Sequence, residues 1–333
     1  GEISSSGSTG VPITYTVSQL AGEVSQQAWT RFFRARDLPN TGNWAEFKTV
    51  DYHGLPISKD IDRLTDDASA FQRFIINKYL GPTQRLDILE ELRINVLLTS
   101  PNDAEIVAAL NKERTQPLKL NCLIGIGQGF SQFQRELIQD SFGCEILSPY
   151  SSKEGTLMAF ECYAGGPFHL NVDTCKFEFL DNRNQAVEVG KSGRVVITPF
   201  FQTAQPLIRY DQGDLATPGT TCVCNRTLPV LQHIDGRQDQ IFRFPDKQVA
   251  VQRVNERLTR DVLGAIALQI AQTAPLHIEV RYVSFADASA DKLESFTAHL
   301  RSVIHPNAEY TFKRMNDLPS NAGGKKQRYV REF

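Results

Sequence analysis

The sequence predicts an α/β fold in two parts: a large N-terminal domain with a mostly parallel sheet and a β-rich subdomain, then a small C-terminal α+β domain. Three observations lead to this prediction. The 333 residues exceed the length of one typical domain. Between residues 18 and 142, strand-like and helix-like patterns alternate at the spacing of βαβ units. From about residue 157 the pattern becomes β-rich, and a further mixed block begins near residue 240.

The N-terminal half begins with a helical pattern. In residues 18–36, one stripe with helical spacing predicts an amphipathic helix; its apolar members are Leu20, Val24, Ala28 and Phe32. Asp103 is well placed to cap a second helix. The expected elements after the first helix are strands over 46–54 and 94–103, a helix over 103–113, a strand over 120–127 and a helix over 131–142. Strands joined through helices in this way imply a parallel sheet.

The rest of the chain has shorter, more alternating segments. Turn-like stretches separate two expected strands, which cover residues 168–181 and 193–200. The final block predicts a small α+β unit with helices over 251–263 and 291–304 and strands over 276–285 and 309–314. A loop rich in glycine and lysine follows the last of these strands.

Composition narrows the class of partner. Apolar residues make up 41% and charged residues 22% of the chain, which is ordinary for a globular protein. The formal net charge is −2 and the cations are spread along the chain, so we expect no binding to nucleic acid or to an anionic membrane. No apolar run is long enough to cross a bilayer, and no secretory leader is present, so we expect a cytoplasmic location. The first residue is not Met, which fits a processed or incomplete form.

A loop of small polar residues opens the chain. The stretch "SSGSTG" at residues 5–10 has two interpretations: a flexible leader, or a loop that holds phosphate. Hydroxyl groups and unhindered backbone N–H groups suit the oxygens of a polyphosphate. The stretch is not a Walker loop, because no GxxxxGK[ST] pattern is present.

Four further motifs follow this loop in a fixed order. They are Tyr-x-x-x-Glu-Gly in "PYSSKEG", Arg-Tyr-x-x-Gly-Asp in "RYDQGD", Gly-Arg-x-Asp in "GRQDQ", and Gly-Lys-x-x-Arg in "GGKKQR". The series resembles the adenylate-forming superfamily, which activates carboxylic acids with ATP, and within it the phenylacetate–coenzyme A ligase branch. The matching stretches span nearly the whole chain, although the segment that precedes the Ser/Thr/Gly loop in that family is absent. With four partners in register, the phosphate-loop interpretation is favoured over the leader.

The resemblance implies roles for residues of the large domain, 1–238. Glu154 helps to hold Mg²⁺, a hard cation that prefers oxygen ligands. Tyr150 lies against adenine, and Asp214 binds the ribose hydroxyl groups with help from Arg237. The loop that wraps the β- and γ-phosphates consists of Ser5, Ser6, Gly7, Ser8, Thr9 and Gly10.

The resemblance also implies a mobile small domain, 239–333, with its hinge near Asp239. This domain carries Lys325 to the α-phosphate and the substrate carboxylate. A carboxylate is already ionised near pH 7, so its attack on phosphorus needs alignment and charge neutralisation, not a general base. The expected cofactors are ATP and Mg²⁺, and the expected substrate is a carboxylic acid, with an aryl acid favoured by the resemblance. Coenzyme A as acyl acceptor, a homodimeric assembly and a role like that of atypical members in phenazine antibiotic biosynthesis are left open.

A second set of residues has metal-ligating chemistry. The phenylacetate-type branch often carries a cysteine cluster, and its pieces here are Cys162, His169, Cys222 and Cys224. Three thiolates and one imidazole make a closed tetrahedral set that suits structural Zn²⁺. Cys175 can replace one ligand in this scheme. The alternative is that the four are unrelated core or surface residues.

Several positions depart from the family pattern. Val11 stands where the family often has Lys, Ser151 where it has Gly, and Lys153 where it has Thr. The segment 241–252 has no glycine, although members that acylate coenzyme A usually have one after the hinge. We therefore expect adenylation more firmly than thioester formation. Two alternatives remain: a degenerate nucleotide- or aryl-acid-binding module, and an acyl-protein synthetase that works through a covalent cysteine.

Overall fold

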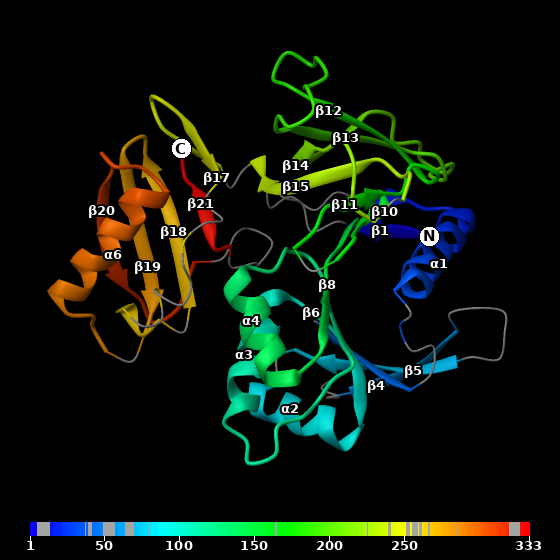
Figure 1. Cartoon of the computed structure of the whole chain (residues 1–333), viewed down its shortest axis with the longest axis horizontal. Coiled ribbons are helices and arrows are strands. Elements are labelled where there is room, and N and C mark those ends of the chain that lie inside the picture. The colour runs from blue at the N-terminus through cyan, green and yellow to red at the C-terminus, as the bar shows by residue number, and fades with distance from the viewer. Residues whose placement is uncertain are drawn as a thin grey trace.

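The computed structural model places three groups of elements around the middle of the molecule (Figure 1). It describes residues 1–4, 14–36, 38, 42–48, 57–63, 70–78, 80–163, 165–224, 226–238, 241–250, 254, 259, 262–265, 267–284, 286–319 and 327–333.

The first group is a six-stranded sheet with helices against it. The strand order is β4-β5-β3-β6-β7-β8, and every neighbouring pair is parallel except β4 with β5. The predicted mostly parallel sheet is thus confirmed. The strands are β3 (Asn43–Lys48), β4 (Ile57–Arg63), β5 (Ala70–Asn77), β6 (Ile94–Thr99), β7 (Cys122–Gly125) and β8 (Glu145–Leu147). The helices are α2 (Pro82–Glu91), α3 (Pro101–Lys112) and α4 (Gln132–Phe142).

The start of α3 corrects one prediction. The N-cap is Ser100, not Asp103, because the Ser100 Oγ accepts a hydrogen bond from the Asp103 backbone N–H at 3.2 Å. Asp103 instead sits in the first turn, where its carboxylate accepts from the same hydroxyl at 2.7 Å. A carboxylate in the first turn still favours the helix through the helix dipole.

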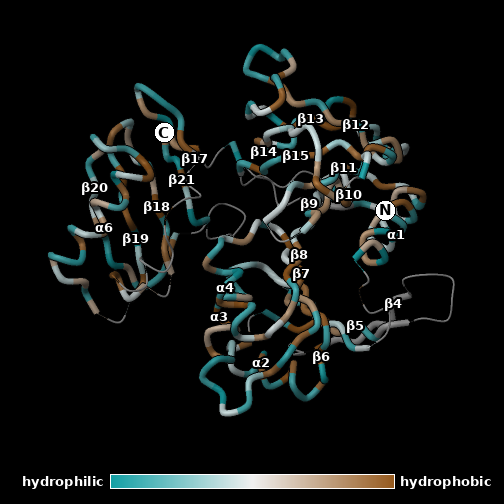
Figure 2. Tube along the Cα trace, viewed as in Figure 1, coloured by the Kyte–Doolittle hydropathy of each residue, from teal (hydrophilic) through white to brown (hydrophobic). Residues whose placement is uncertain are grey.

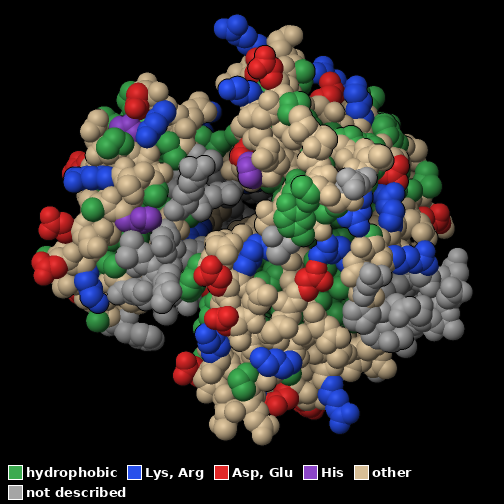
Figure 3. Space-filling view, in the orientation of Figure 1, with side chains coloured by type: hydrophobic (Ala, Val, Ile, Leu, Met, Phe, Trp, Pro, Cys, Tyr) green, Lys and Arg blue, Asp and Glu red, His purple; other side chains and the backbone are tan. Residues whose placement is uncertain are grey.

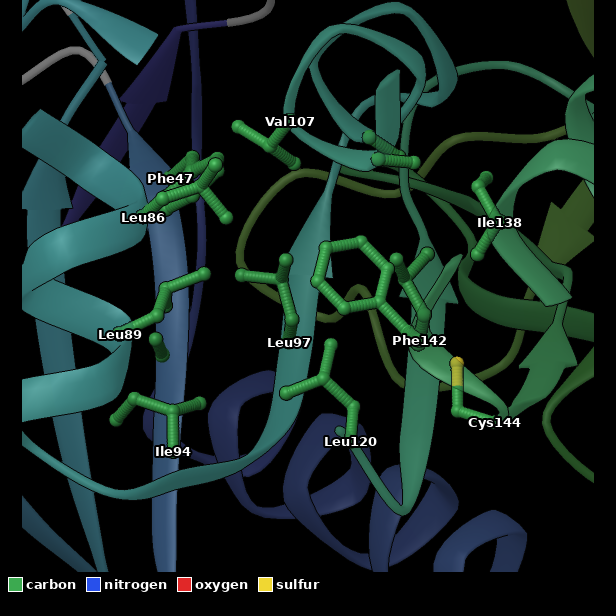
Figure 4. Close-up of a cluster of buried hydrophobic side chains, with 14 of the residues drawn as sticks. Phe47, Leu86, Leu89, Ile94, Leu97, Val107, Leu120, Ile138, Phe142 and Cys144 are labelled. Atoms are coloured by element: carbon green, nitrogen blue, oxygen red, sulfur yellow. The ribbon is translucent and has the colours of Figure 1, made fainter. Parts of the chain in front are cut away.

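The sheet and its helices share one apolar core. Phe142, at the end of α4, is fully buried and points toward Leu97 of β6 (Figure 4). Leu89 of α2 and Ile138 of α4 are also fully buried in this core. Hydrophobic stretches run along the inner strands such as β7 (Figure 2). This core holds the carboxyl ends of the strands in fixed places relative to one another.

Helix α1 (Gln19–Ala35) packs beside the second group. Ser18 caps it, accepting from the Ala21 N–H at 3.1 Å. Ala28 and Phe32 of the predicted stripe are buried, but Leu20 is 48% exposed, so the stripe is narrower than predicted. Two short paired strands precede the helix, β1 (Glu2–Ser4) and β2 (Thr14–Thr16).

The second group is a seven-stranded antiparallel sheet, which confirms the predicted β-rich part. Its order is β12-β13-β14-β15-β11-β10-β9. Strand β15, the last of these in sequence, pairs with β11, which belongs to the early β10–β11 hairpin. The strands are β9 (Pro149–Ser152), β10 (Thr156–Glu161), β11 (Phe168–Leu170), β12 (Cys175–Leu180), β13 (Gly193–Pro199), β14 (Tyr210–Pro218) and β15 (Val230–Arg237).

A buried ion pair joins the first two groups. Arg135 of α4 donates to both carboxylate oxygens of Glu161 in β10, at 2.8 and 3.0 Å, and to Ser148 Oγ at 3.1 Å. The two side chains are 12% and 4% exposed. Burial raises the pKa of Glu161, and Arg135 opposes that rise. The pair therefore depends on both partners being present.

Replacing Arg135 by Met is expected to destabilise the protein by about 3–5 kcal/mol, because Glu161 is then left buried without its cation. Urea unfolding with and without the change measures this. The control is Arg114→Met, which removes the surface ion pairs with Asp87 and Glu90 and is expected to cost about 1 kcal/mol or less. Equal losses for the two variants would contradict the assignment of a buried, interdependent pair.

The third group lies nearest the C-terminus. Its four-stranded sheet has the order β20-β19-β18-β21, α6 packs with it, and a two-stranded hairpin, β16 with β17, lies beside it. The elements are β16 (Ile241–Arg243), β17 (Gln248–Ala250), β18 (Ala267–Ala274), β19 (His277–Val283), α6 (Ala290–Val303), β20 (Glu309–Arg314) and β21 (Tyr329–Arg331).

The core of this third group is formed by its own residues. Buried members run from Phe242 to Ala308, and Phe296 of α6 is fully buried among them. Most of the helix predicted over 251–263 lies outside the described residues, and so does the hinge residue Asp239. The division into 1–238 and 239–333 therefore stays a prediction.

The surface shows no concentration of one charge on the face seen in Figure 3, where acidic and basic side chains are interspersed. None of the helices in the described part of the chain is both long and apolar enough to cross a membrane.

Candidate active site and metal centre

Glu154 lies in the tight turn between β9 and β10. The Gly155 N–H donates to Ser152 Oγ at 2.9 Å, and the Gln202 amide donates to the Glu154 carbonyl oxygen at 3.2 Å. The Glu154 residue is only 7% exposed. Its carboxylate receives no hydrogen bond and no ion pair from any residue that the structure describes. A carboxylate without a protein partner has its oxygens available as ligands, so the turn fits a bound cation.

Asp214 is the centre of a second cluster. The Tyr150 hydroxyl donates to Asp214 Oδ2 at 2.7 Å, and Arg237 lies 3.0 Å from Oδ1. Strand pairing explains this, because Asp214 of β14 and Arg237 of β15 are direct cross-strand partners. The structure therefore brings three of the residues predicted for nucleotide binding together around Asp214. Tyr150 is 8% exposed and packs in the core of the antiparallel sheet.

Tyr210 connects the two clusters. Burial raises the pKa of Tyr210, the negative charge of Glu154 raises it further, and Arg237 opposes the rise. Asp214 also acts on this phenol. Charges at these positions affect one hydroxyl group only when they lie near the same space. Glu154 and Asp214 therefore border a common region around Tyr210.

The remaining predicted residues of the nucleotide site lie outside the described part of the chain. These are the loop of Ser5, Ser6, Gly7, Ser8, Thr9 and Gly10, and the lysine Lys325. Their roles, and those of Tyr150, Glu154, Asp214 and Arg237, stay predictions. Lys153, which departs from the family pattern, is exposed, whereas its neighbour Glu154 is buried.

The structure brings the four predicted metal ligands together. Ligand atoms of Cys162, His169, Cys222 and Cys224 all lie within 4.8 Å of one another, and Cys224 Sγ is 3.2 Å from His169 Nε2. Bonds of about 2.3 Å to thiolates in a tetrahedron place sulfur atoms about 3.8 Å apart, so the set is close to the size that Zn²⁺ needs. The group ties the β10–β11 hairpin to the loop between β14 and β15.

The surroundings of the cluster affect the ligands differently. The backbone N–H of Arg226 lowers the pKa of Cys224 to about 6, whereas burial raises that of Cys162 to about 12. Arg226 also donates toward Cys162 Sγ at 3.5 Å. His169 is fully buried, and its Nδ1 has no acceptor among the described residues. The donor set fits a thiolate-rich metal site.

The other three cysteines have thiols of low nucleophilicity, because they are buried. Cys175 lies in the core of the antiparallel sheet and not in the metal cluster, so the idea that it replaces a ligand is not supported. Burial raises the pKa of Cys144 and Cys175 to about 12, and it raises that of Cys122 as well. A protonated thiol is a poor nucleophile, which disfavours covalent catalysis at these three positions.

Two polar residues of the site had no role in the sequence analysis. Tyr15 of β2 and Gln202 are 2% and 3% exposed, and each has a side-chain oxygen without a partner among the described residues. Sequence patterns cannot show that a polar atom is buried, because this depends on contacts made far along the chain. The position of Tyr15 five residues after the predicted phosphate loop was the one available signal.

The chain has detectable relatives, although no protein-family model matches it. It is 25% identical over 207 residues to protein CapK of Staphylococcus aureus, which covers 59% of this chain and 43% of that protein. It is 24% identical over 233 residues to phenylacetate-coenzyme A ligase of Thermus thermophilus, which covers 67% of this chain and 50% of the ligase. The chain thus spans about half of these two proteins or less.

Solved structures with similar architecture are coenzyme A ligases. 2-Hydroxyisobutyryl-CoA ligase, in the postadenylation state with 2-HIB-AMP, superposes with a TM-score of 0.76 at 17% identity, covering all of this chain and 73% of that one. The same ligase in the thioesterification state superposes with a TM-score of 0.60. Anthranilate CoA ligase AuaEII, in complex with anthranoyl-AMP, gives 0.73 at 12% identity, covering 98% of this chain and 65% of that one. The chain therefore has the fold of the adenylate-forming superfamily, as its series of motifs indicates.

Proposed function

We propose that the chain belongs to an enzyme that activates a carboxylic acid with ATP. A carboxylate oxygen attacks the α-phosphorus, the bond between that phosphorus and the α,β-bridging oxygen breaks, and pyrophosphate leaves with the bonding electrons. The products are an acyl-AMP and pyrophosphate. Support comes from the order of the motifs, the shared fold, and relatives that include a phenylacetate-coenzyme A ligase.

The observation that carries this proposal is the Glu154 carboxylate, which has no partner among the described residues and lies, like Asp214, near Tyr210. Mg²⁺ at this position neutralises charge on the phosphate oxygens. Asp214 and Arg237 hold the ribose end of the nucleotide, while the loop 5–10 holds the distal phosphates. Lys325 from the C-terminal part supplies a positive charge at the reacting phosphate.

The substrate that we propose is an aromatic or related acid. A neighbour in fold carries anthranoyl-AMP, and a relative in sequence is a phenylacetate-coenzyme A ligase. Coenzyme A is one candidate acceptor. A cytoplasmic location and a role in phenazine antibiotic biosynthesis stay predictions.

The metal cluster adds a structural role to the proposal. We place Zn²⁺ at Cys162, His169, Cys222 and Cys224, because the four ligand atoms are close enough for one ion. The ion would hold two distant β-segments together and take no part in the reaction.

Release of pyrophosphate tests the function. The protein with ATP and Mg²⁺ is incubated with benzoate, phenylacetate, anthranilate or no acid, and pyrophosphate is measured. Acid-dependent release supports adenylation. If no acid in an extended panel causes release and ATP still binds, the second candidate, a degenerate binding module, is supported. Val11, Ser151 and Lys153 favour that candidate because they replace residues usual in the family.

Asp214→Asn is expected to weaken AMP binding by about 10- to 100-fold, because a charged acceptor for the ribose hydroxyl groups is lost. Isothermal titration with AMP measures the change. The control is Asp211→Asn in the same strand, whose carboxylate pairs with Arg194 at the surface. The control is expected to bind AMP like the wild type. Unchanged binding by Asp214→Asn would show that the ribose lies elsewhere.

A further inference from the structure

Two buried oxygen atoms near the Glu154 turn lack partners. They belong to Tyr15 and Gln202, which are 2% and 3% exposed. The Tyr15 hydroxyl and the Gln202 Oε1 make no hydrogen bond with the residues that the structure describes. Buried polar groups in folded proteins are almost always satisfied. Two exceptions beside the Glu154 carboxylate, which has no ion pair among the described residues, indicate a bound ligand that satisfies them together.

A hydrogen bond places the Gln202 side chain beside the Glu154 turn. The Gln202 Nε2 donates to the Glu154 carbonyl oxygen at 3.2 Å, which leaves only the Oε1 of this side chain without a partner. The Gln202 segment also runs beside β2, because Gln205 Oε1 accepts from the Thr16 N–H at 3.0 Å. Tyr15 precedes Thr16 and points into the interior. The Tyr15 side chain therefore enters the region between β2 and the Glu154 turn.

The three groups differ in hydrogen-bonding chemistry. Tyr15 is a neutral donor, since burial raises its pKa and the charge of Glu154 raises it further. The Glu154 carboxylate and the Gln202 Oε1 are acceptors. A hydrated divalent cation with phosphate oxygens supplies each complement: the cation for the carboxylate, a metal-bound water for the amide oxygen, and a phosphate oxygen for the phenol.

We propose that Tyr15 and Gln202 are positioning residues of the metal–triphosphate site. The Tyr15 hydroxyl donates to a phosphate oxygen of ATP, and Gln202 Oε1 accepts from a water on the cation held by Glu154. Tyr15 suits this task because strand β2 begins four residues after the predicted phosphate loop. This inference rests on the proposed function and adds two residues to its nucleotide site.

The test is Tyr15→Phe, which removes only the hydroxyl. In the absence of nucleotide the melting temperature is expected to stay the same or rise, because a buried group without a partner is removed. The affinity for MgATP is expected to fall about tenfold or more, since a hydrogen bond to a charged oxygen is lost. Affinity for AMP, which has no β- or γ-phosphate, is expected to stay unchanged. The control is Tyr163→Phe, a tyrosine that is 47% exposed.

Gln202→Met is the second variant that tests the proposal. It is expected to raise the Mg²⁺ concentration at which ATP binding reaches half of its maximum, by about threefold or more, and to leave AMP binding alone. Melting temperatures of this variant and the wild type are compared with and without MgATP. Smaller stabilisation of the variant by MgATP is the expected result.

The outcomes separate the two proposals. Unchanged MgATP binding by Tyr15→Phe, with normal AMP binding, overturns the inference and leaves the proposed function standing. A melting temperature that falls by several degrees without ligand also overturns it, because the hydroxyl then has a structural partner. A wild-type protein that binds neither ATP nor AMP overturns the proposed function and the inference together.

Discussion

Lys325→Ala is expected to lower the rate of acyl-AMP formation by about a hundredfold or more while the protein stays folded. The resemblance assigns this ammonium to the α-phosphate and the attacking carboxylate, where negative charge accumulates in the transition state. Removing one such donor from an enclosed site typically costs two to three orders of magnitude in rate. Acid-dependent exchange of labelled pyrophosphate into ATP measures the step directly.

Lys326 provides a matched control, because it is the same residue type one position away. Lys326→Ala is expected to keep exchange within about threefold of the wild type, since the motif assigns the catalytic role to Lys325 alone. Circular dichroism checks that both variants are folded. Equal rates for Lys325→Ala and the wild type would remove this lysine from the reaction.

Loss of the metal cluster is expected to have the largest effect on stability. The purified protein should contain about one Zn²⁺ per chain, and Cys224→Ser should abolish it. A loss of about 5 kcal/mol corresponds to a fall in melting temperature of roughly 10–20 °C for a domain of this size. The reason is that the ion joins the β10–β11 hairpin to the loop before β15.

Cys122→Ala is the control for the metal, because Cys122 is buried in β7 and is not part of the cluster. Metal analysis and thermal melts are run on both variants and on wild type treated with a chelator. Cys122→Ala is expected to keep its zinc. Wild-type protein that is free of metal and melts at the same temperature after chelation would rule out a structural zinc ion.

Local sequence patterns predicted the elements whose burial follows a simple period. The parallel sheet followed from apolar strands such as β6 and β7, each with a helix after it. Helix α2 was missed although Leu86 and Leu89, three residues apart, are buried in the core. Its Arg85 is also buried, at 4% exposed, and pairs with Asp103 at 2.8 Å, a contact that no local pattern indicates. Pro82 at its first position was a signal that the sequence did contain.

Strands with polar sequences were also missed. Strand β4 reads "ISKDIDR", which has too few apolar residues to indicate a strand. Strand β18 contains two buried glutamines, and Gln269 donates to the Gln327 carbonyl oxygen at 2.9 Å. Such residues become compatible with burial only after a distant segment satisfies them.

The candidate site also has a part that was predicted from the sequence and a part that was not. The resemblance to the phenylacetate-type branch implied that Cys162 and His169 would meet Cys222 and Cys224, and the structure brings them together. The roles of Tyr15 and Gln202 could not be predicted, because they rest on burial and on the absence of a partner among the described residues. Neither property has a pattern in the sequence.

The decisive measurement is a crystal structure with a non-hydrolysable ATP analogue, Mg²⁺ and an accepted acid. We expect the distal phosphates at residues 5–10, the cation on Glu154, the ribose on Asp214, and Lys325 Nζ within hydrogen-bond distance of the α-phosphate or the carboxylate. A nucleotide bound away from Glu154 and Asp214, or a loop and a lysine on opposite sides of the protein, would contradict it.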